Sequence, residues 1–531
     1  MRQTRREFIK NTSLAAAAAS VSGRGELLAS PSPVVGQSDA ALKELCLLAL
    51  DAARTAGATY ADVRIVNVRD QLVTTRESRV TAVSDNEAFG VGVRALMRGV
   101  WGFAATRRVT REDCQRVATE AVAQAEASSR AVLRPVQLAA VDAYPDGVWR
   151  SPIRKEPFRV PLDEKIDLLL SANAAALGVR GARLVSSSIS ILRQQTTFAS
   201  TEGSIIEQTV YRTVPEMTVT AMAADSSSVQ SRSSAEVAPM GLGYEHVEQA
   251  NLSERARQWA EEAVEKLSAR PVEPGRFDLV LEPSNLLLTV RETIGHPTEL
   301  DRVLGYEANY GGSSFLTPPE ELIGKLQYGP EFMNVLGDRT QEGALATIGW
   351  DDEGVPADSW SIVKDGVLVD YQTTREQVGR ISDLTGITRS HGCSHAQSWE
   401  WVQLQRMPNI SLMPGEDDYV SDDLIAATDR GILIRGSGTY SIDQQRYAFR
   451  FGGQVAYEIR DGRLGGMVRD VAYEGNVLEF WNSMDMLGGP RSYFIGGTIG
   501  DVKGQPAQRS AASHGCPPAR FHDCSVINTA Q

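Results

Sequence analysis

The sequence lacks several features that would place it in a class at once. Its 531 residues include only five cysteines and six histidines, and no run of 18 or more apolar residues occurs. Five cysteines in a chain of this length cannot form a disulfide framework, and without a long apolar run no membrane-spanning segment is expected. Acidic residues outnumber basic ones, 67 to 54. This balance argues against a nucleic-acid binder, because phosphate neutralisation requires Lys and Arg.

Familiar nucleotide and hydrolase motifs are also missing: there is no Walker loop, no G-x-S-x-G elbow and no dinucleotide fingerprint.

The N-terminus has the residue pattern of an export signal. Arg5 and Arg6 precede a short, weakly apolar run from Leu14 to Val21, which is the order of a twin-arginine export signal. The alternative is a chance Arg pair in a tail. We predict that residues 1–36 are a signal and linker, and that the protein is exported to the periplasm.

The part of the chain that follows contains the order helix, strands, helix twice, which favours two α+β units over residues 37–133 and 155–270. Apolar spacing of three and four predicts helices, and alternating β-branched residues predict strands. The predicted helices are 39–57, 110–127, 162–178 and 252–268. The predicted strands are 60–66, 71–78, 79–86 and 90–97 in the first unit, and 183–192, 194–201, 204–214 and 216–224 in the second. The two units resemble distant copies of each other.

Residues 271–531 form a third, larger region with many strands and glycine turns. Asp461-Gly462 lies between two alternating segments, which predicts a tight hairpin. The fold class expected for the whole chain is therefore α+β, with antiparallel sheets and segregated helices in the two smaller units and a strand-rich C-terminal domain.

The clearest candidate site lies on a predicted helix over residues 285–296. Glu292 and His296 are four residues apart and therefore share a face, and Glu299 follows three residues later. Such a set can bind a metal ion or pair an acid with a base. A solvated helix face with ordinary ion pairs is the alternative.

Two further clusters contain potential metal ligands. His514 and Cys516 flank a glycine, and both are good zinc ligands; alternatively, Cys516 forms a disulfide with Cys524. His391, Cys393 and His395 are spaced by two residues, so they would share one face of a strand or converge in a loop. For the pattern formed by His391, Cys393 and His395, a polar loop without metal is the more common outcome.

Taken together, the segments resemble the TldD/PmbA family, also described as modulators of DNA gyrase or as peptidase family U62. The resemblance is carried by YADVRIV at 60–66, GVGVRALMRGVWGFAAT at 90–106, RMPNISLMPG at 406–415 and GILIRGSGTYSID at 431–443. It implies a metallopeptidase that cuts unfolded or flexible peptides. It also implies a dimer of related subunits, one with the catalytic motif and one without it.

The resemblance implies an H-E-x-x-x-H motif, which here reads Arg291-Glu292-Thr293-Ile294-Gly295-His296. Glu292 matches the catalytic glutamate and His296 the second metal ligand, whereas Arg291 replaces the first ligand, and a guanidinium cannot coordinate a metal. The stretch that matches a family cysteine loop, residues 497–500, has no cysteine.

Three functions therefore stay open. In the first, a relocated zinc site uses His296, His514 and Cys516, with Glu299 as a further ligand; Glu292 acts as general base and Arg291 holds the peptide carboxylate or the developing oxyanion. In the second, the chain is a non-catalytic partner subunit of a peptidase. In the third, Cys516 is a nucleophile and His514 or His296 is its base.

Overall fold

The computed structural model describes residues 39–530, so the predicted export signal at 1–36 lies outside the described residues. From Leu42 onward the chain forms one compact unit. Within the described part, none of the helices combines the length and apolar character needed to cross a membrane. Antiparallel sheets with helices packed against them dominate the architecture, which confirms the α+β fold class.

A seven-stranded sheet joins the two predicted N-terminal units. Its strand order is β3-β2-β1-β5-β6-β4, with β7 paired to β6. Within this sheet, only β4 runs parallel to its neighbour. The strands are β1 (Tyr60–Arg76), β2 (Arg79–Met97), β3 (Val100–Thr106), β4 (Gly147–Arg150), β5 (Ala182–Ser200), β6 (Ile205–Met222) and β7 (Val229–Ser233). Strand β1 comes from the first unit and β5 from the second, and their pairing runs without a register shift from Asp62 opposite Ser200 to Arg76 opposite Ser186. The two units therefore share one sheet.

The strands of this sheet are longer than the sequence pattern predicts. The pattern indicates separate strands at 60–66 and 71–78, but both belong to the single strand β1, and β5 and β6 are continuous in the same way. The apolar alternation breaks at Asn67, Arg69 and Asp70. Those polar residues nevertheless continue the ladder, and Arg69 pairs with Asp85 on β2 at 2.8 Å. A cross-strand ion pair thus replaces the expected turn.

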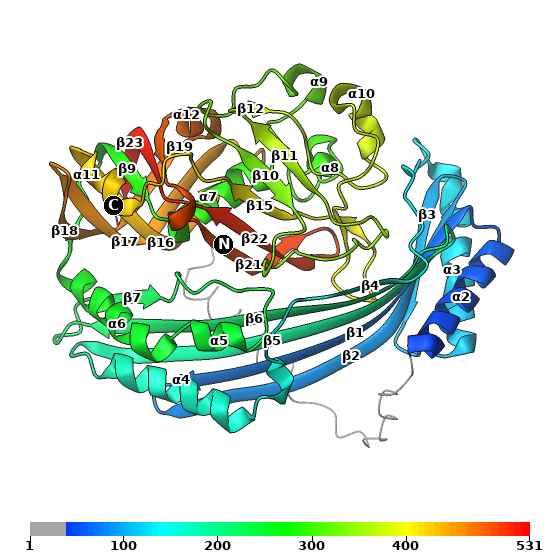
Figure 1. Cartoon of the computed structure of the whole chain (residues 1–531), viewed down its shortest axis with the longest axis horizontal. Helices are drawn as coiled ribbons and strands as arrows, with labels where there is room; N and C mark the ends of the chain where they lie inside the picture. Colours follow the sequence, from blue (N-terminus) through cyan, green and yellow to red (C-terminus); the bar gives the residue numbers. More distant parts are fainter. Residues whose placement is uncertain (1–38, 531) are drawn as a thin grey trace, which may run out of the picture. The chain divides into compact units, whose positions relative to one another are not determined.

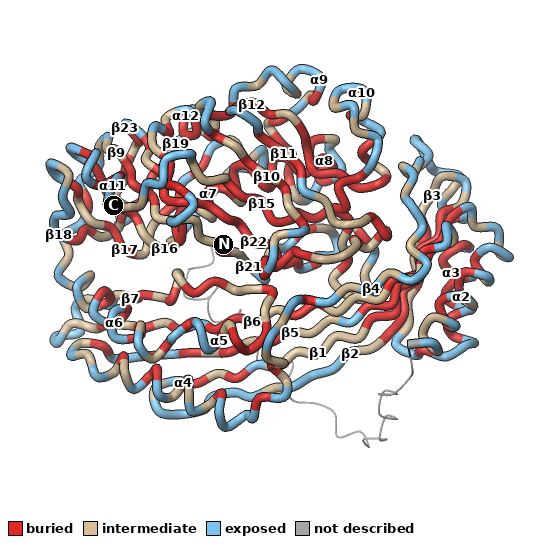
Figure 2. The backbone as a smooth tube through the Cα atoms, viewed as in Figure 1, coloured by how far each residue is buried: buried red, intermediate tan, exposed pale blue. Residues whose placement is uncertain are grey.

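Helices cover the two ends of this long sheet, as Figure 1 shows. At one end α2 (Asp39–Thr55) and α3 (Arg111–Ser128) pack against the buried parts of β1 and β2. At the other end lie α4 (Leu162–Leu177), α5 (Glu245–Gln249) and α6 (Leu252–Ser268). Thr110 caps α3 by accepting a hydrogen bond from the Asp113 amide. Figure 2 shows that β2 is buried only at the α2–α3 end.

The C-terminal region contains an eight-stranded sheet and a four-stranded sheet around one large apolar core. The eight strands are β8 (Arg270–Pro271), β9 (Gly275–Leu281), β16 (Arg430–Ile442), β17 (Ala448–Arg460), β18 (Arg463–Arg469), β19 (Val471–Asn476), β20 (Met484–Leu487) and β23 (Ala519–Asn528). The four strands are β10 (Val335–Asp338), β11 (Ser359–Lys364), β12 (Val367–Leu368) and β15 (Asn409–Leu412). The hairpin predicted at Asp461-Gly462 is confirmed, because these residues join β17 to β18 with positive φ angles of 48° and 72°.

Two hairpins and several short helices complete the region and position the candidate site. One hairpin pairs β21 (Phe494–Lys503) with β22 (Gln508–Cys516), and the other pairs β13 (Ser394–His395) with β14 (Leu404–Gln405). Helix α7 (Pro283–Val290) contacts both β21 and β22. The remaining helices are α8 (Leu300–Val303), α9 (Pro319–Leu322), α10 (Ser382–Thr385), α11 (Ser421–Ala426) and α12 (Val477–Asn482).

Candidate functional site

The predicted helix over 285–296 ends in a π-helical turn. Helix α7 stops at Val290, and residues Arg291–Gly295 form the π turn, in which the His296 amide donates to the Arg291 carbonyl at 2.9 Å. Gly295 permits a close approach here, because a Cβ at that position would lie 2.4 Å from the Met407 sulfur. A π turn re-aims side chains and occurs frequently at functional sites. In this chain the turn joins Arg291 to His296, five residues further on, through one backbone hydrogen bond.

Both carboxylate oxygens of Glu292 are occupied by arginines. Arg291 donates to Oε1 from Nε at 3.1 Å and from Nη2 at 2.8 Å. Arg446, from the turn between β16 and β17, donates to Oε2. The Glu292 side chain is only 3% exposed. Each oxygen of Glu292 thus accepts charge-assisted hydrogen bonds from a guanidinium.

His296 lies between two carboxylates. Its Nδ1 is 3.1 Å from Glu299 Oε2, and its Nε2 is 3.6 Å from Asp501 Oδ1 on β21. Asp501 is also paired with Arg406 at 2.7 Å. Burial alone would raise the pKa of Asp501, but the charges of His296 and Arg406 hold that pKa well below its usual range. The predicted pair of His296 and Glu299 is therefore in contact, and Asp501 completes the set.

Sequence reasoning misses Asp501. The stretch 497–500, which matches a family cysteine loop, ends directly before the residue that reaches His296. The available signal is the alternation of Asp501 and Lys503, which share one face of a strand. Lys503 Nζ lies 3.2 Å from Glu299 and 2.8 Å from Asp301, and the Lys503 side chain is 2% exposed. Burial would raise the pKa of Glu299, but Lys503 and His296 hold it well below its usual value.

His514 and Cys516 do not form the predicted metal site together: His514 lies near enough to this cluster for the charges of Arg291, Asp501 and His296 to act on its pKa, whereas Cys516 points elsewhere. His514 Nδ1 is 3.3 Å from the Ile410 carbonyl, and its Nε2 has no hydrogen-bond partner. Burial, followed by the positive charge of Arg291, lowers the pKa of His514 to about 3. Cys516 instead faces the core, where its thiol donates to the Pro283 carbonyl at 3.7 Å.

The surroundings of Cys516 do not support the thiol chemistry considered from the sequence. Burial raises the pKa of the Cys516 thiol far above its ordinary value, with the Glu282 charge acting in the same direction. A neutral thiol is a poor nucleophile and a poor metal ligand. Cys516 and Cys524 are both free, so the alternative disulfide is not formed.

The predicted cluster of His391, Cys393 and His395 does not converge on one site, because the two histidines have different partners. His391 lies between Asp358, 2.8 Å from Nδ1, and Asp370, 2.9 Å from Nε2, and it stacks on Trp360 with ring centroids 4.1 Å apart. His395 lies elsewhere, with its Nδ1 3.7 Å from Asp352. Among residues 39–530, no three His, Cys, Asp or Glu side chains are grouped so that they could hold a metal ion.

Comparisons with known proteins agree with this architecture. Three family models match: PmbA/TldA metallopeptidase domain 1 over residues 61–125, the central domain over 155–270, and the C-terminal domain over 274–528. The fold and these matches define the class as a three-domain metallopeptidase scaffold. The chain belongs to the PmbA/TldD metallopeptidase family.

Relatives and solved structures cover most of the chain. A metalloprotease from Methanothermobacter thermautotrophicus is 28% identical over 88% of this chain and 96% of its own length. Another metalloprotease, from Methanocaldococcus jannaschii, is 26% identical over 81% of this chain and 89% of its own. A crystal structure described as a modulator of DNA gyrase, from Bacteroides thetaiotaomicron, superposes with a TM-score of 0.68 at 17% identity and covers 92% of this chain and 98% of its own. At 17% identity, this similarity to the crystal structure shows a shared fold only.

Proposed function

We propose that this chain is a non-hydrolysing member of its metallopeptidase family, which binds peptide and serves as the partner of a related, motif-bearing subunit. The observation that carries the proposal is the pair of guanidiniums on Glu292. A general base must have a free oxygen within reach of the proton that it removes. Here Arg291 donates twice to Oε1 and Arg446 donates once to Oε2, so three of the roughly four acceptor sites of the Glu292 carboxylate are taken by two guanidiniums.

The metal that the family name implies does not fit the donor set. Zinc needs about four ligands at 2.0–2.3 Å, and catalytic sites take three of them from the protein. Arg291 places a permanent positive charge where a ligand would be required, and Arg406 pairs with Asp501, the carboxylate nearest His296 Nε2. A divalent cation would meet two fixed guanidiniums, which disfavour its binding at this site.

The same residues suit recognition of a peptide. Arg291 is 13% and Arg446 is 19% exposed, so each guanidinium keeps an edge toward solvent. Tyr440, more than half exposed, lies with its ring 5.9 Å from the Arg291 guanidinium. Guanidiniums beside an aromatic ring can hold a carboxylate or a backbone carbonyl of an extended peptide. In this role Glu292 positions the two arginines.

We further propose that the protein acts in the periplasm after twin-arginine export. The support is the order of Arg5, Arg6 and the apolar run in the sequence. The proposed partner subunit would supply the metal ligands that this chain lacks.

The decisive experiment compares metal content and peptide cleavage in the wild-type protein and in two variants at one position. Wild type and R291Q are expected to bind much less than one zinc per chain and to leave flexible peptides uncut. R291H is expected to gain zinc affinity, because it offers an imidazole beside His296 and Asp501 and removes the repelling charge. About one zinc per wild-type chain, with peptide cleavage that is lost in E292Q, would overturn the proposal in favour of a zinc peptidase.

A further inference from the structure

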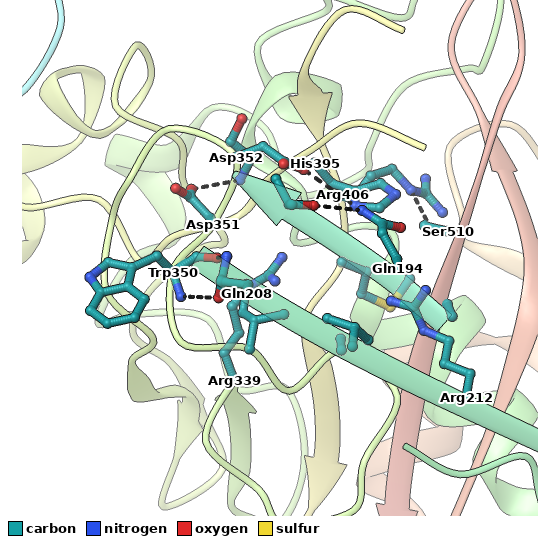
Figure 3. A pocket seen from close by; sticks show the side chains of 17 residues that line it. Gln194, Gln208, Arg212, Arg339, Trp350, Asp351, Asp352, His395, Arg406 and Ser510 are labelled. Atoms are coloured by element: carbon teal, nitrogen blue, oxygen red, sulfur yellow. Dashed lines mark hydrogen bonds and ion pairs between the residues drawn. The ribbon is translucent and has the colours of Figure 1, made fainter. Parts of the chain in front are cut away.

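A small cavity lies between the seven-stranded sheet and the C-terminal region, away from Glu292. Its volume is about 50 Å³. The lining comes from β5 and β6, from the segment after β10, and from β13 and β22 (Figure 3). By the usual requirement of about 10–15 Å³ for one water, it has room for roughly three to five water molecules. A carboxylate or a tetrahedral oxyanion has a similar number of heavy atoms.

Two arginines line this cavity without an ionic partner. Among the described residues, no carboxylate oxygen lies within ion-pair distance of Arg212 or Arg339. Arg212 donates from Nε to the Leu345 carbonyl at 3.2 Å. Arg339 is 4% exposed, and its Nε has no hydrogen-bond partner. Burial and the nearby charge of Arg339 lower the pKa of Arg212 to about 10. The half-buried Arg212 and the buried Arg339 therefore repel each other across this cavity, and the charge of Asp352 only partly offsets that repulsion at Arg212.

The two carboxylates of the cavity are engaged with other groups. The Asp351 carboxylate accepts from the backbone amides of Glu353, Val355 and Ser394 at 2.8–3.0 Å. Burial and the charge of Glu353 raise the pKa of Asp351, whereas Arg339 and the backbone amides act in the opposite direction, so Asp351 is a counter-charge at a distance and not an ion-pair partner of Arg339. Asp352 accepts from the Ala396 amide at 2.8 Å. Both carboxylates thus hold the loop, and neither forms an ion pair with the two arginines.

The other two titratable residues that line the cavity, His395 and Arg406, add no negative charge to it. Burial, together with Arg212 and Arg406, lowers the pKa of His395 to about 4, so its ring is neutral near pH 7. Arg406 is already paired with Asp501 at 2.7 Å, and its Nε donates to Ser510 at 2.7 Å. Arg212 and Arg339 are therefore the cations of this cavity that lack an ion pair.

We propose that Arg212 and Arg339 form a binding site for a small oxyanion, with the chemistry of a carboxylate or an inorganic phosphate. A buried charge without a partner is costly, and a bound anion removes that cost for both cations at once. Guanidiniums are suited to this role because their paired N–H groups match two oxygens of such an anion. The volume admits only the oxyanion itself, either as a free ion or as the end group of a longer molecule. The site is independent of whether Glu292 is catalytic.

Two sources could supply such a group: free phosphate, or the C-terminal carboxylate of a peptide. The test measures thermal unfolding and calorimetric binding of the full chain at constant ionic strength, with chloride as the reference salt. The probes are phosphate, a short peptide with a free C-terminal carboxylate, and the same peptide as its C-terminal amide. A response to phosphate identifies a free anion as the ligand. A response to the acid peptide but not to its amide identifies a peptide terminus.

Variants decide whether the response belongs to this cavity. In R212M and R339M the stabilisation by the effective probe should disappear, and in R212K and R339K the affinity should fall by about tenfold or more, because a lysine cannot form the paired contact. R183M, which removes an exposed arginine on β5, should respond like the wild type. Equal stabilisation in wild type, R212M and R339M would overturn the proposal. So would a wild-type protein that responds to neither phosphate nor the acid peptide beyond the chloride reference.

Discussion

At the scale of single residues, Arg291 changes what its neighbours can do. Its guanidinium makes the adjacent Glu292 the acceptor of a charge-assisted pair. The same charge helps to keep His514 neutral by lowering its pKa. One arginine therefore alters the electrostatics of the residues around it.

Glu292 should accordingly contribute to stability in this chain. E292Q would leave two guanidiniums without a carboxylate, and we expect the free energy of unfolding to fall by about 2–4 kcal/mol, since breaking a buried ion pair is strongly destabilising. A strained catalytic base would behave differently, because replacing such a residue commonly stabilises an enzyme. Urea denaturation of E292Q and of E254Q, an exposed control on α6, measures the difference. An unchanged or higher stability of E292Q would contradict the role given to Glu292.

His391 should make the stability depend on pH. Burial opposes its protonation, but Asp358 and Asp370 outweigh burial and raise the pKa of His391 above its ordinary 6.5. A raised folded-state pKa means that the stabilising contribution is complete below pH 6.5 and is lost as the pH rises through the folded-state value. H391Q should therefore lose about 1–3 kcal/mol at pH 6 and less at pH 9. A loss that stays constant from pH 6 to pH 9, measured by denaturant unfolding, would exclude this origin.

The sequence predicted the local part of the site but not its distant partners. The spacing placed Glu292, His296 and Glu299 together; His296 and Glu299 are in contact, whereas the Glu292 carboxylate is paired with Arg291 and Arg446 instead. Their partners Arg446, Arg406, Asp501 and Lys503 come from segments much further along the chain. Helical and strand periodicity describe only local neighbours, so no pattern in the sequence connected these charges with the motif.

At the scale of secondary-structure elements, the predicted helices corresponded more closely to the structure than the strands did. The helices at 162–178 and 252–268 were expected from apolar spacing and appear as Leu162–Leu177 and Leu252–Ser268. The long strands were divided in the prediction because polar residues interrupt their alternation. Strand β1 pairs with β2 on one side and with β5 on the other, so ladder hydrogen bonds continue across its polar middle. Such support from two neighbours cannot be seen in one segment.

The β21–β22 hairpin connects the C-terminal end of the chain to the motif through Lys503. In K503M the carboxylates of Glu299 and Asp301 would lose the ammonium that lies 3.2 and 2.8 Å from them. We expect the free energy of unfolding to fall by about 3 kcal/mol or more, because buried carboxylates would then lack their cation. K364M, at an exposed lysine on β11, serves as the control. If K503M and K364M unfold at the same urea concentration, Lys503 does not neutralise this cluster.

At the scale of the whole molecule, buried charges connect the seven-stranded sheet to the C-terminal region. Arg94 on β2 donates to Asp62 on β1 at 2.7 Å and to Glu353 at 3.1 Å, and all three residues are buried. Gln403 donates to the other oxygen of Asp62 at 2.8 Å. This network joins residues from the first strands of the chain to loops of its C-terminal region. Composition and periodicity could therefore divide the chain into units but could not predict how those units are joined.

The network should make the sheet and the C-terminal region unfold together. In R94M two buried carboxylates, Asp62 and Glu353, lose their common cation, so the contact between the two parts is weakened by several kcal/mol. Calorimetry of the wild type should show one cooperative transition. R94M should instead show a broadened or split transition, with proteolytic cleavage of the sheet at a lower temperature than cleavage of the C-terminal region. R107M, at an exposed arginine beside β3, should retain the wild-type profile. A single sharp transition in R94M would mean that apolar contacts alone couple the two parts.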